Sequence, residues 1–378
     1  MKIDYNDNKL ERFIPITFIE LQEEVCKLQI IEKNLLEEFT NRLRNYYHKE
    51  FHSELLKLKT NYHPFNPDRD TITLKNFSKE ELIRKEEKLL DDIIPLLNSA
   101  NYEQLTQDSI NQAIKETSPY GVDVSVDFNE FDNLHLFFRG SAIREENQRT
   151  AKSFYLKKER VQTRIYRRLF LFFKQKVDGK ELIYLKLFKD IPQSDLEMLF
   201  PNIKVKISLL DKIKLTITGG GGTIAGSMTL IGKMAVSLEP MALLSALGAF
   251  GVIVGRQITS IFTHRTKYMA KLAKNLYFYN LDNNAGAISH ILDMAEDEES
   301  KEVFLAYLFI LKSSKSLTKE KLDSNIEKFI HDTFNIPMDF EIDDALEKLE
   351  KLGLIKQIRN NEKLEAIDIE QALVILRK

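Results

Sequence analysis

A group of charged residues surrounds a predicted tight turn in the middle of the sequence. In the stretch LKLFKDIPQSDLEMLFP, lysines and carboxylates flank Ile191-Pro192: Lys186, Lys189, Asp190, Asp195 and Glu197. General acid–base catalysis needs such groups to converge in a cleft that shifts their pKa values. Arg139 can join them if its predicted strand lies in the same sheet. The stretch therefore defines a candidate charged site.

The same residues also suit a plain corner between a strand and a helix. Ser194 or Asp195 can cap a short helix, and Arg139 can pair with a carboxylate. We favour this structural interpretation, since no catalytic constellation stands out. Whether the chain is an enzyme stays open, leaning towards no, and no cofactor is expected.

Other residue types with chemical potential lack the required spacing. The glycine run from Gly219 is followed by Gly232-Lys233-Met234, whereas a phosphate-binding P-loop needs Ser or Thr after the lysine. A group of potential metal ligands lies in a helical segment: His290, Asp293, Glu296 and Asp297. Helical spacing does not place all four on one face, so no metal site is expected. The lone cysteine, Cys26, excludes an internal disulfide.

The composition indicates a folded chain with no global preference for polyanions. The chain has 378 residues, 43% of them hydrophobic, and a formal net charge of −2. Residues 149–176 differ, because they hold ten Lys or Arg and one acid. This segment can form a basic surface for anionic lipid or nucleic acid, or it can form solvated strand edges, and we favour the edges. Nucleic acid is therefore an unlikely partner.

The periodicity of apolar residues predicts an α+β fold. Helical spacing fills residues 17–60 and resumes after Ser78, which forms a capping-box pattern with Glu81. Alternating apolar residues predict strands at 122–128, 134–140, 165–176, 182–188 and 204–210. Asp178-Gly179 is typical of a hairpin turn between two of them.

One long segment is almost free of charge. Residues 217–237 and 240–261 each carry one charged residue over a length that can span a bilayer, and Glu239-Pro240 can form the turn. Glycines with the spacing of close helix packing occur in both halves: Gly222, Gly226, Gly251 and Gly255. A buried helical pair of a soluble fold is the alternative. We favour a transmembrane helical hairpin at 213–263.

The flanks of this segment are basic on both sides. The flanking cations are Lys212, Lys214, Arg265, Lys267 and Lys271. Cations accumulate on the cytoplasmic side of membranes, so both termini are expected there, at a bacterial inner membrane or its organelle equivalent. These residues are expected to face lipid, which makes the bilayer an expected partner.

The C-terminal residues 317–378 follow the order helix, helix, hairpin, which resembles a winged helix. The second helix carries a net charge of −3 between Glu341 and Lys351. A DNA-reading helix at this place needs positive charge, because phosphate repels an acidic helix. We therefore expect a protein-contacting or structural module.

Several stretches along the chain carry a resemblance to a known family. They are ERFIPI (11–16), PFNPDRDT (64–71), FDNLHLFFRG (131–140), LKLFKDIPQSDLEMLFP (185–201), LLDKIKL (209–215) and KNLYFYNLDNN (274–284). The chain resembles the transmembrane protein 143-like family of unknown function. The resemblance implies an integral membrane protein with an internal hydrophobic hairpin, and it supplies no reaction and no catalytic residues.

These expectations divide the chain into five parts. They are a helical N-terminal region (1–118), an α+β domain (119–212), the transmembrane hairpin (213–263), a helical linker region (264–316) and the winged-helix-like module (317–378). The expected function is a membrane-anchored, cytoplasm-facing adaptor or scaffold that binds a protein partner or a second copy. The alternatives are an enzyme built on Arg139, Lys186, Asp190 and Glu197, or a nucleic-acid-binding protein that uses residues 149–176.

Overall fold

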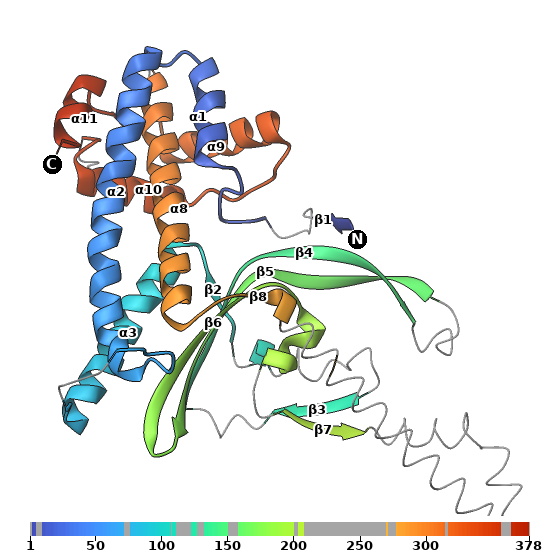
Figure 1. Cartoon of the computed structure of the whole chain (residues 1–378). Helices are drawn as coiled ribbons and strands as arrows, with labels where there is room; N and C mark the ends of the chain where they lie inside the picture. The colour runs from blue at the N-terminus through green and yellow to red at the C-terminus, as the bar shows by residue number, and fades with distance from the viewer. Residues whose placement is uncertain are drawn as a thin grey trace, which may run out of the picture.

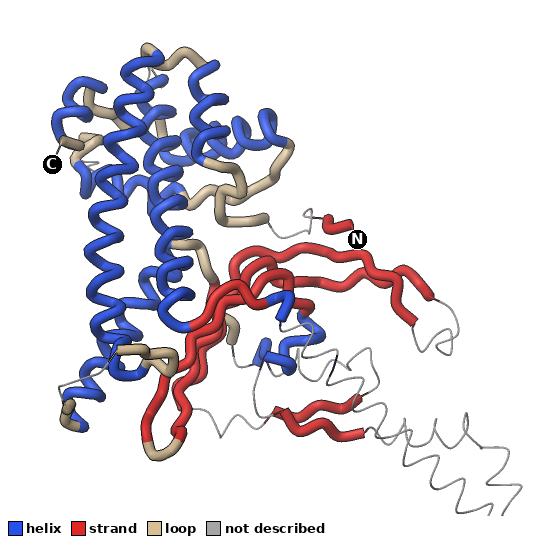
Figure 2. The backbone as a smooth tube through the Cα atoms, viewed as in Figure 1, coloured by secondary structure: helices blue, strands red, loops and turns tan. Residues whose placement is uncertain are grey.

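A layer of helices packs against a twisted antiparallel sheet (Figure 1). The computed structural model describes residues 2–4, 10–71, 76–106, 108–110, 122–126, 132–149, 158–199, 203–207, 270, 277–313, 317–356 and 364–377. Figure 2 shows the helices on one side of the long strands. The fold class is therefore mixed helix and antiparallel sheet.

Three helices form the N-terminal part. They are α1 (Phe18–Lys27), α2 (Lys33–Tyr62, followed by the short 3-10 helix η1, His63–Phe65) and α3 (Lys79–Ser99). The predicted capping box of α3 is confirmed, because Ser78 and Glu81 bond to each other's backbone amides. Thr17 and Glu20 cap α1 in the same way. Gln29 has a φ of +51°, so the chain turns between α1 and α2 rather than continuing one long helix.

The main sheet has the order β1-β4-β5-β6-β8, with β2 paired to β4. Its strands are β1 (Lys2–Asp4), β2 (Glu103–Gln104), β4 (Asp132–Arg149), β5 (Lys158–Val177), β6 (Lys180–Pro192) and β8 (Asn280–Asn283). The strands β3 (Val122–Val126) and β7 (Ile203–Ile207) form a separate antiparallel pair, and a 3-10 helix, η4 (Gln193–Leu199), follows β6. Asp178 and Gly179 both have positive φ, which suits the tight turn that joins β5 to β6.

Alternation along β5 sends side chains to two different cores. Phe170 and Phe172 lie in the large core under the helices, whereas Leu169 and Leu171 lie in a smaller core on the other face, with Leu196 of η4. The period of two in a strand produces this division. Residues on neighbouring positions of one strand therefore serve opposite sides of the sheet.

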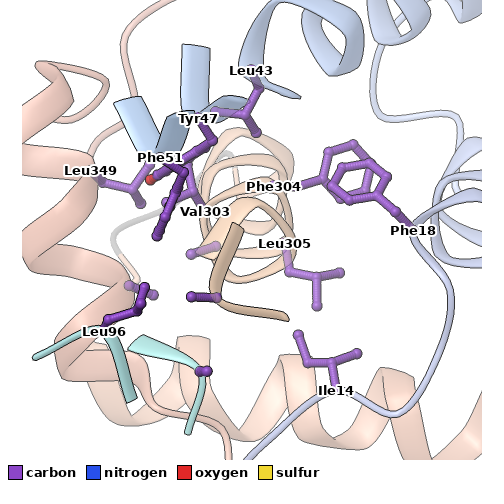
Figure 3. Close-up of a cluster of buried hydrophobic side chains, with 14 of the residues drawn as sticks. Ile14, Phe18, Leu43, Tyr47, Phe51, Leu96, Val303, Phe304, Leu305 and Leu349 are labelled. Carbon is purple, nitrogen blue, oxygen red and sulfur yellow. The ribbon is translucent and has the colours of Figure 1, made fainter. Parts of the chain in front are cut away.

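Helix α8 (Asn284–Lys312) runs through the centre of the helical layer. Every residue from 298 to 310 is buried, and α1, α2 and α10 surround this stretch (Figures 1 and 3). Phe304 packs on Phe18 of α1 with ring centroids 5.0 Å apart, and Tyr307 stacks on Phe39 of α2 at 4.7 Å. Such aromatic pairs add about 1 kcal/mol each beyond simple burial.

The C-terminal elements pack against α8. They are α9 (Lys319–Phe334), α10 (Ile342–Leu352) and α11 (Ile369–Ile375), with antiparallel bridges Leu317 to Leu364 and Ile355 to Ala366. The described part of the predicted winged-helix-like module 317–378 thus contains helices and isolated bridges, and its assignment as a winged helix stays a prediction. The Tyr307 hydroxyl of α8 donates to the Ile367 carbonyl over 3.0 Å, so α8 is an integral part of this module.

The helices of the structure contradict the prediction of an integral membrane protein. No helix in the described part of the chain is long and apolar enough to cross a bilayer. In α8, the apolar run 303–311 directly follows the polar residues 298–302. This finding overturns three predictions: the transmembrane hairpin as part of the fold, the assignment as a membrane protein and the location in a membrane. Residues 213–263 themselves lie outside the described residues.

Candidate functional site at the charged centre of helix α8

Five consecutive polar residues are buried in the middle of α8. They are Glu298, Glu299, Ser300, Lys301 and Glu302, here called the charged centre, and none is more than 8% exposed. Consecutive residues on a helix point in all directions, so elements must cover this level from every side. Burying charge is costly unless each group finds a partner. The partners therefore identify what the charged centre holds together.

Glu298 and Lys301 bind the chain just before α1. The Ile14 amide donates to Glu298 Oε1 over 2.6 Å, and Lys301 Nζ donates to the Ile14 carbonyl over 3.2 Å. The N-terminal segment thus uses both backbone groups of one residue to contact α8. Lys301 also pairs with Asp297 one turn earlier.

Glu298 also joins α8 to the sheet. Arg139 Nη2 of β4 lies 2.8 Å from Glu298 Oε2, and the guanidinium stacks over the Phe13 ring at 4.2 Å. The neighbouring Gly140 has a φ of +72°, and a Cβ there would lie 2.8 Å from both Glu11 Oε2 and Phe13 Cε1. Only glycine lets the N-terminal segment approach β4 this closely.

Lys348 of α10 neutralises the other side of the charged centre. Its Nζ lies 2.6 Å from Glu302, 3.2 Å from Glu299 and 2.6 Å from Asp344. Asn101, after α3, donates from Nδ2 to Glu302 over 3.0 Å and to the Arg12 carbonyl over 3.1 Å. One set of buried charges thus joins the N-terminal segment, the sheet, the end of α3 and the C-terminal module.

Burial shifts the proton affinities in this group. Loss of hydration raises the pKa of Glu302 to about 8, because it outweighs the attraction of Lys348. Burial likewise raises the pKa values of Glu298 and Glu299. Burial alone would lower the pKa of Lys348, but Glu302, Glu299 and Asp344 hold it above its usual value. Burial therefore disfavours the ionised form of these carboxyl groups, while their negative charge favours the charged form of Lys348.

A cavity opens from the charged centre between α2, α3 and α10. Its volume is about 230 Å³, and its lining includes Glu299, Lys348, Tyr47 and Glu54. Figure 3 shows Tyr47 and Phe51 of α2 gathered on the side of α8 where Leu96 of α3 and Leu349 of α10 also lie. The cavity is the place where a small molecule can reach the buried charges.

The sheet separates two members of the predicted charged site. Arg139 contacts Glu298 on the helical side. Lys186 lies 6.0 Å from the ring of Phe173, a residue of the smaller core on the other face, and burial lowers the pKa of Lys186. The structure therefore does not bring these two cations together.

The other members of the predicted charged site occupy the corner itself. Lys189 is opposite Arg168 in the β5–β6 ladder. Asp190 has a φ of +52°, and its carbonyl accepts a hydrogen bond from Arg144. Asp195 is buried in η4, and the side chain of Glu197 is outside the described part. A catalytic role for the group stays a prediction.

The basic segment 149–176 is partly neutralised where it enters the body of the protein. Lys174 lies 2.9 Å from Glu86 of α3 and 3.4 Å from Glu181 of β6. Arg167 lies over Phe13 at 4.9 Å. These inner cations hold the sheet to its surroundings.

Three of the potential metal ligands, for which no metal site is expected, have separate partners. His290 Nδ1 contacts Asp282 over 2.7 Å, and Glu296 lies 3.3 Å from His48 Nδ1. Asp297 pairs with Lys301. Two further predicted sets lie outside the described residues: the glycines Gly222, Gly226, Gly251 and Gly255, and the basic residues Lys212, Lys214, Arg265, Lys267 and Lys271.

Sequence reasoning missed the charged centre. The run Glu-Glu-Ser-Lys-Glu predicts a solvated helical surface, because charged runs usually face water. The apolar run Val303 to Leu311 that follows it was the available signal, since it indicates that the same helix is buried. The partner residues Ile14, Arg139 and Lys348 are too distant in sequence to be recognised from spacing.

Comparison with known proteins places one domain in this chain. A family described as "Protein of unknown function (DUF3754)" matches residues 131–286, which run from β4 to the first turn of α8. No solved structure matches the chain. The charged centre and the lining of the cavity lie outside the matched residues. The resemblance to a transmembrane protein 143-like family gains no confirmation, and what the comparison shows is that the chain contains a DUF3754 domain, a domain of unknown function.

Proposed function

We propose that the protein is an adaptor that binds a basic segment of another protein through the C-terminal module. The supporting observation is an acidic face formed by Asp323 and Glu327 of α9, Asp339 of the following loop and Asp343 of α10. Burial, together with the carboxylates of Glu327, Asp339 and Asp343, raises the pKa of Asp323 to about 6. These side chains therefore create a common negative potential.

The cations of the module leave most of this charge uncompensated. Residues 319–352 contain ten acids and five lysines. Lys348 is turned inward against α8, and Lys351 pairs with Glu50 of α2. Lys319 pairs with Asp343 and is the one cation bonded to the acidic face within the described residues. A Lys- or Arg-rich segment fits this potential, whereas a nucleic acid backbone does not.

The contacts at the charged centre explain how such a module can serve an adaptor. Lys348 fixes α10 on α8, and Glu298 fixes the sheet and the N-terminal segment on the same helix. A partner bound at the acidic face would thus be held at a defined position relative to the DUF3754 domain. Rigid attachment of a docking face to a second domain is what a scaffold requires.

A binding experiment with a defined peptide tests the proposal. The probe is a fluorescein-labelled dodecapeptide of alternating Arg and Lys, followed by anisotropy with the full chain at 50 and 300 mM salt. We expect binding that weakens at least about tenfold at the higher salt, as exposed charges are screened. A peptide of alternating Glu and Lys should bind far less.

Matched charge reversals locate the binding face. Asp339→Lys together with Asp343→Lys should weaken binding by about tenfold or more. The control is Glu23→Lys together with Glu37→Lys, which makes the same change in net charge at exposed positions of α1 and α2. Equal loss in both double variants, or no binding of the basic peptide at 50 mM salt, would rule out the acidic face as the docking site.

A further inference from the structure

The cavity between α2, α3 and α10 has a polar wall of unusual composition. Tyr46, Tyr47, Glu50 and Glu54 line it from α2, and Glu299 lines it from α8. Phe51 and Leu96 supply apolar surface in the same space of about 230 Å³. Ligand sites commonly combine an apolar body with a few polar groups in this way.

Tyr47 has a polar group for which the protein offers no partner. Its side chain is 4% exposed, and within the described residues its hydroxyl makes no hydrogen bond. Burial raises the pKa of Tyr47, and the carboxylates of Glu299 and Glu50 raise it further, so the phenol keeps its proton. The hydroxyl is therefore available to a molecule that enters the cavity.

The cavity also carries one carboxylate more than its cations neutralise. Lys351 pairs with Glu50 over 3.3 Å, and Lys348 pairs with Glu299 over 3.2 Å. Glu54, one turn after Glu50 on α2, has no ion pair within the described part of the chain. Burial raises the pKa of Glu54, the negative charges of Asp92 and Glu50 add to the effect, and Lys57 opposes it without cancelling it. A positive charge from outside would relieve this repulsion.

We propose that this cavity binds a small organic cation, namely an aliphatic amine or guanidinium compound of the diamine and polyamine type. The cationic group donates hydrogen bonds to the Glu54 carboxylate and to the Tyr47 hydroxyl oxygen. Its alkyl chain packs on Phe51 and Leu96, and the rings of Tyr46 and Tyr47 attract the charge through their faces. An apolar cavity of about 150 Å³ holds benzene, so this cavity accommodates roughly ten non-hydrogen atoms.

The inference does not rest on the proposed adaptor function. The acidic face lies on α9 and the start of α10, whereas the cavity lies between α10 and α2. The two proposals therefore use different carboxylates. Because Lys351 and Leu352 belong to α10, a bound cation would also brace α10 against α2.

Calorimetric titration of the full chain with putrescine, agmatine and spermidine tests the proposal. We expect saturable binding of at least one of them, together with a rise in thermal midpoint. The matched uncharged probe is 1,4-butanediol, which should bind at least about tenfold more weakly than putrescine. Equal binding of diol and diamine, or no binding of any amine at 10 mM, would overturn the proposal.

Two conservative variants assign the binding to the cavity. Glu54→Gln and Tyr47→Phe should each weaken amine binding by about tenfold, because each removes a hydrogen bond, to a charged group in the case of Glu54. Without ligand, Tyr47→Phe should fold as stably as the parent, since the lost hydroxyl has no partner. The control, Glu37→Gln, lies on α2 at an exposed position and should leave binding unchanged. Unchanged affinity in both cavity variants would show that the amine binds elsewhere, which would refute the assignment.

Discussion

Lys348 Nζ of α10 lies 2.6 Å from a Glu302 oxygen of α8, and this buried contact closes the C-terminal module onto the central helix. Lys348 also contacts Glu299 and Asp344, so a single ammonium group is shared by three carboxyl groups. The arrangement makes the stability of the module dependent on one side chain.

Replacement of Lys348 should therefore destabilise the protein strongly. Lys348→Met leaves Glu299 and Glu302 without their cation, and removal of one partner from a buried ion pair costs about 3 kcal/mol or more. Urea unfolding measures the loss. Lys319→Met removes a pair with Asp343 that is largely exposed and should change the unfolding free energy little. Similar losses in the two variants would contradict the central role of Lys348.

The pH dependence of stability should reveal the raised pKa of Glu302. Its pKa in the folded protein is about 8, above the usual value near 4.3 for glutamate. A raised carboxyl pKa stabilises the fold fully below about pH 4, and that contribution is lost as the pH rises towards 8. Relative to Glu302→Gln, the parent should lose up to about 1.4 kcal/mol per pH unit between pH 5 and 8. If the unfolding free energies of the parent and of Glu302→Gln changed in parallel across this pH range, a raised pKa of Glu302 would be excluded.

Two glycine substitutions should separate backbone strain from steric contact. Gly140 and Gly179 have nearly the same positive φ, +72° and +78°. A Cβ at Gly179 meets nothing within 4 Å, so Gly179→Ala should cost about 1 kcal/mol for conformation alone. A Cβ at Gly140 approaches Glu11 and Phe13 to 2.8 Å, so Gly140→Ala should cost about 1–3 kcal/mol more. Thermal unfolding of the two variants measures the difference. Equal decreases in their midpoint temperatures would disprove the close approach of the N-terminal segment to Gly140.

Removal of charge from the acidic face should stabilise the isolated protein. The pKa of Asp323 is raised to about 6, so its ionised form is disfavoured in the fold and the protein loses stability as the pH rises through 6. Asp323→Asn should therefore gain about 0.5 kcal/mol at pH 8 and less at pH 5. Asp332→Asn, at an exposed position beside His331, provides the comparison and should change little. If Asp323→Asn stabilised the protein as much at pH 5 as at pH 8, the result would argue against repulsion between the ionised carboxylates of the acidic face.

Local signals in the sequence predicted the local elements well. Ser78 and Glu81 form the expected capping box, and Asp178-Gly179 makes the expected turn. Both features depend on residues that are close in sequence, so their spacing carries the information. The strand β4 extends to Arg149, well beyond the predicted end at residue 140, because pairing with β5 continues past the apolar run.

Long-range partners could not be predicted in the same way. Glu298 is buried because Ile14 and Arg139 meet it, and neither has a spacing relation to α8. Lys186 and Arg139 were grouped by sequence, but the period of two along the strands divides them between the faces of the sheet. The uncharged segment, its basic flanks and its glycine spacing predicted a membrane protein, and the described helices do not support it.

The hydrogen bond from the Ile14 amide to Glu298 joins residues 284 positions apart in the sequence. At the usual speed of translation, roughly 5–20 residues per second, the N-terminal segment waits about 15–60 s for its partner to be synthesised. During that interval Phe18 and Leu21 have no α8 to cover them. The N-terminal segment is therefore among the last parts of the chain to form its native contacts. Until α8 has been synthesised, the nascent protein must keep the apolar face of α1 from binding other chains.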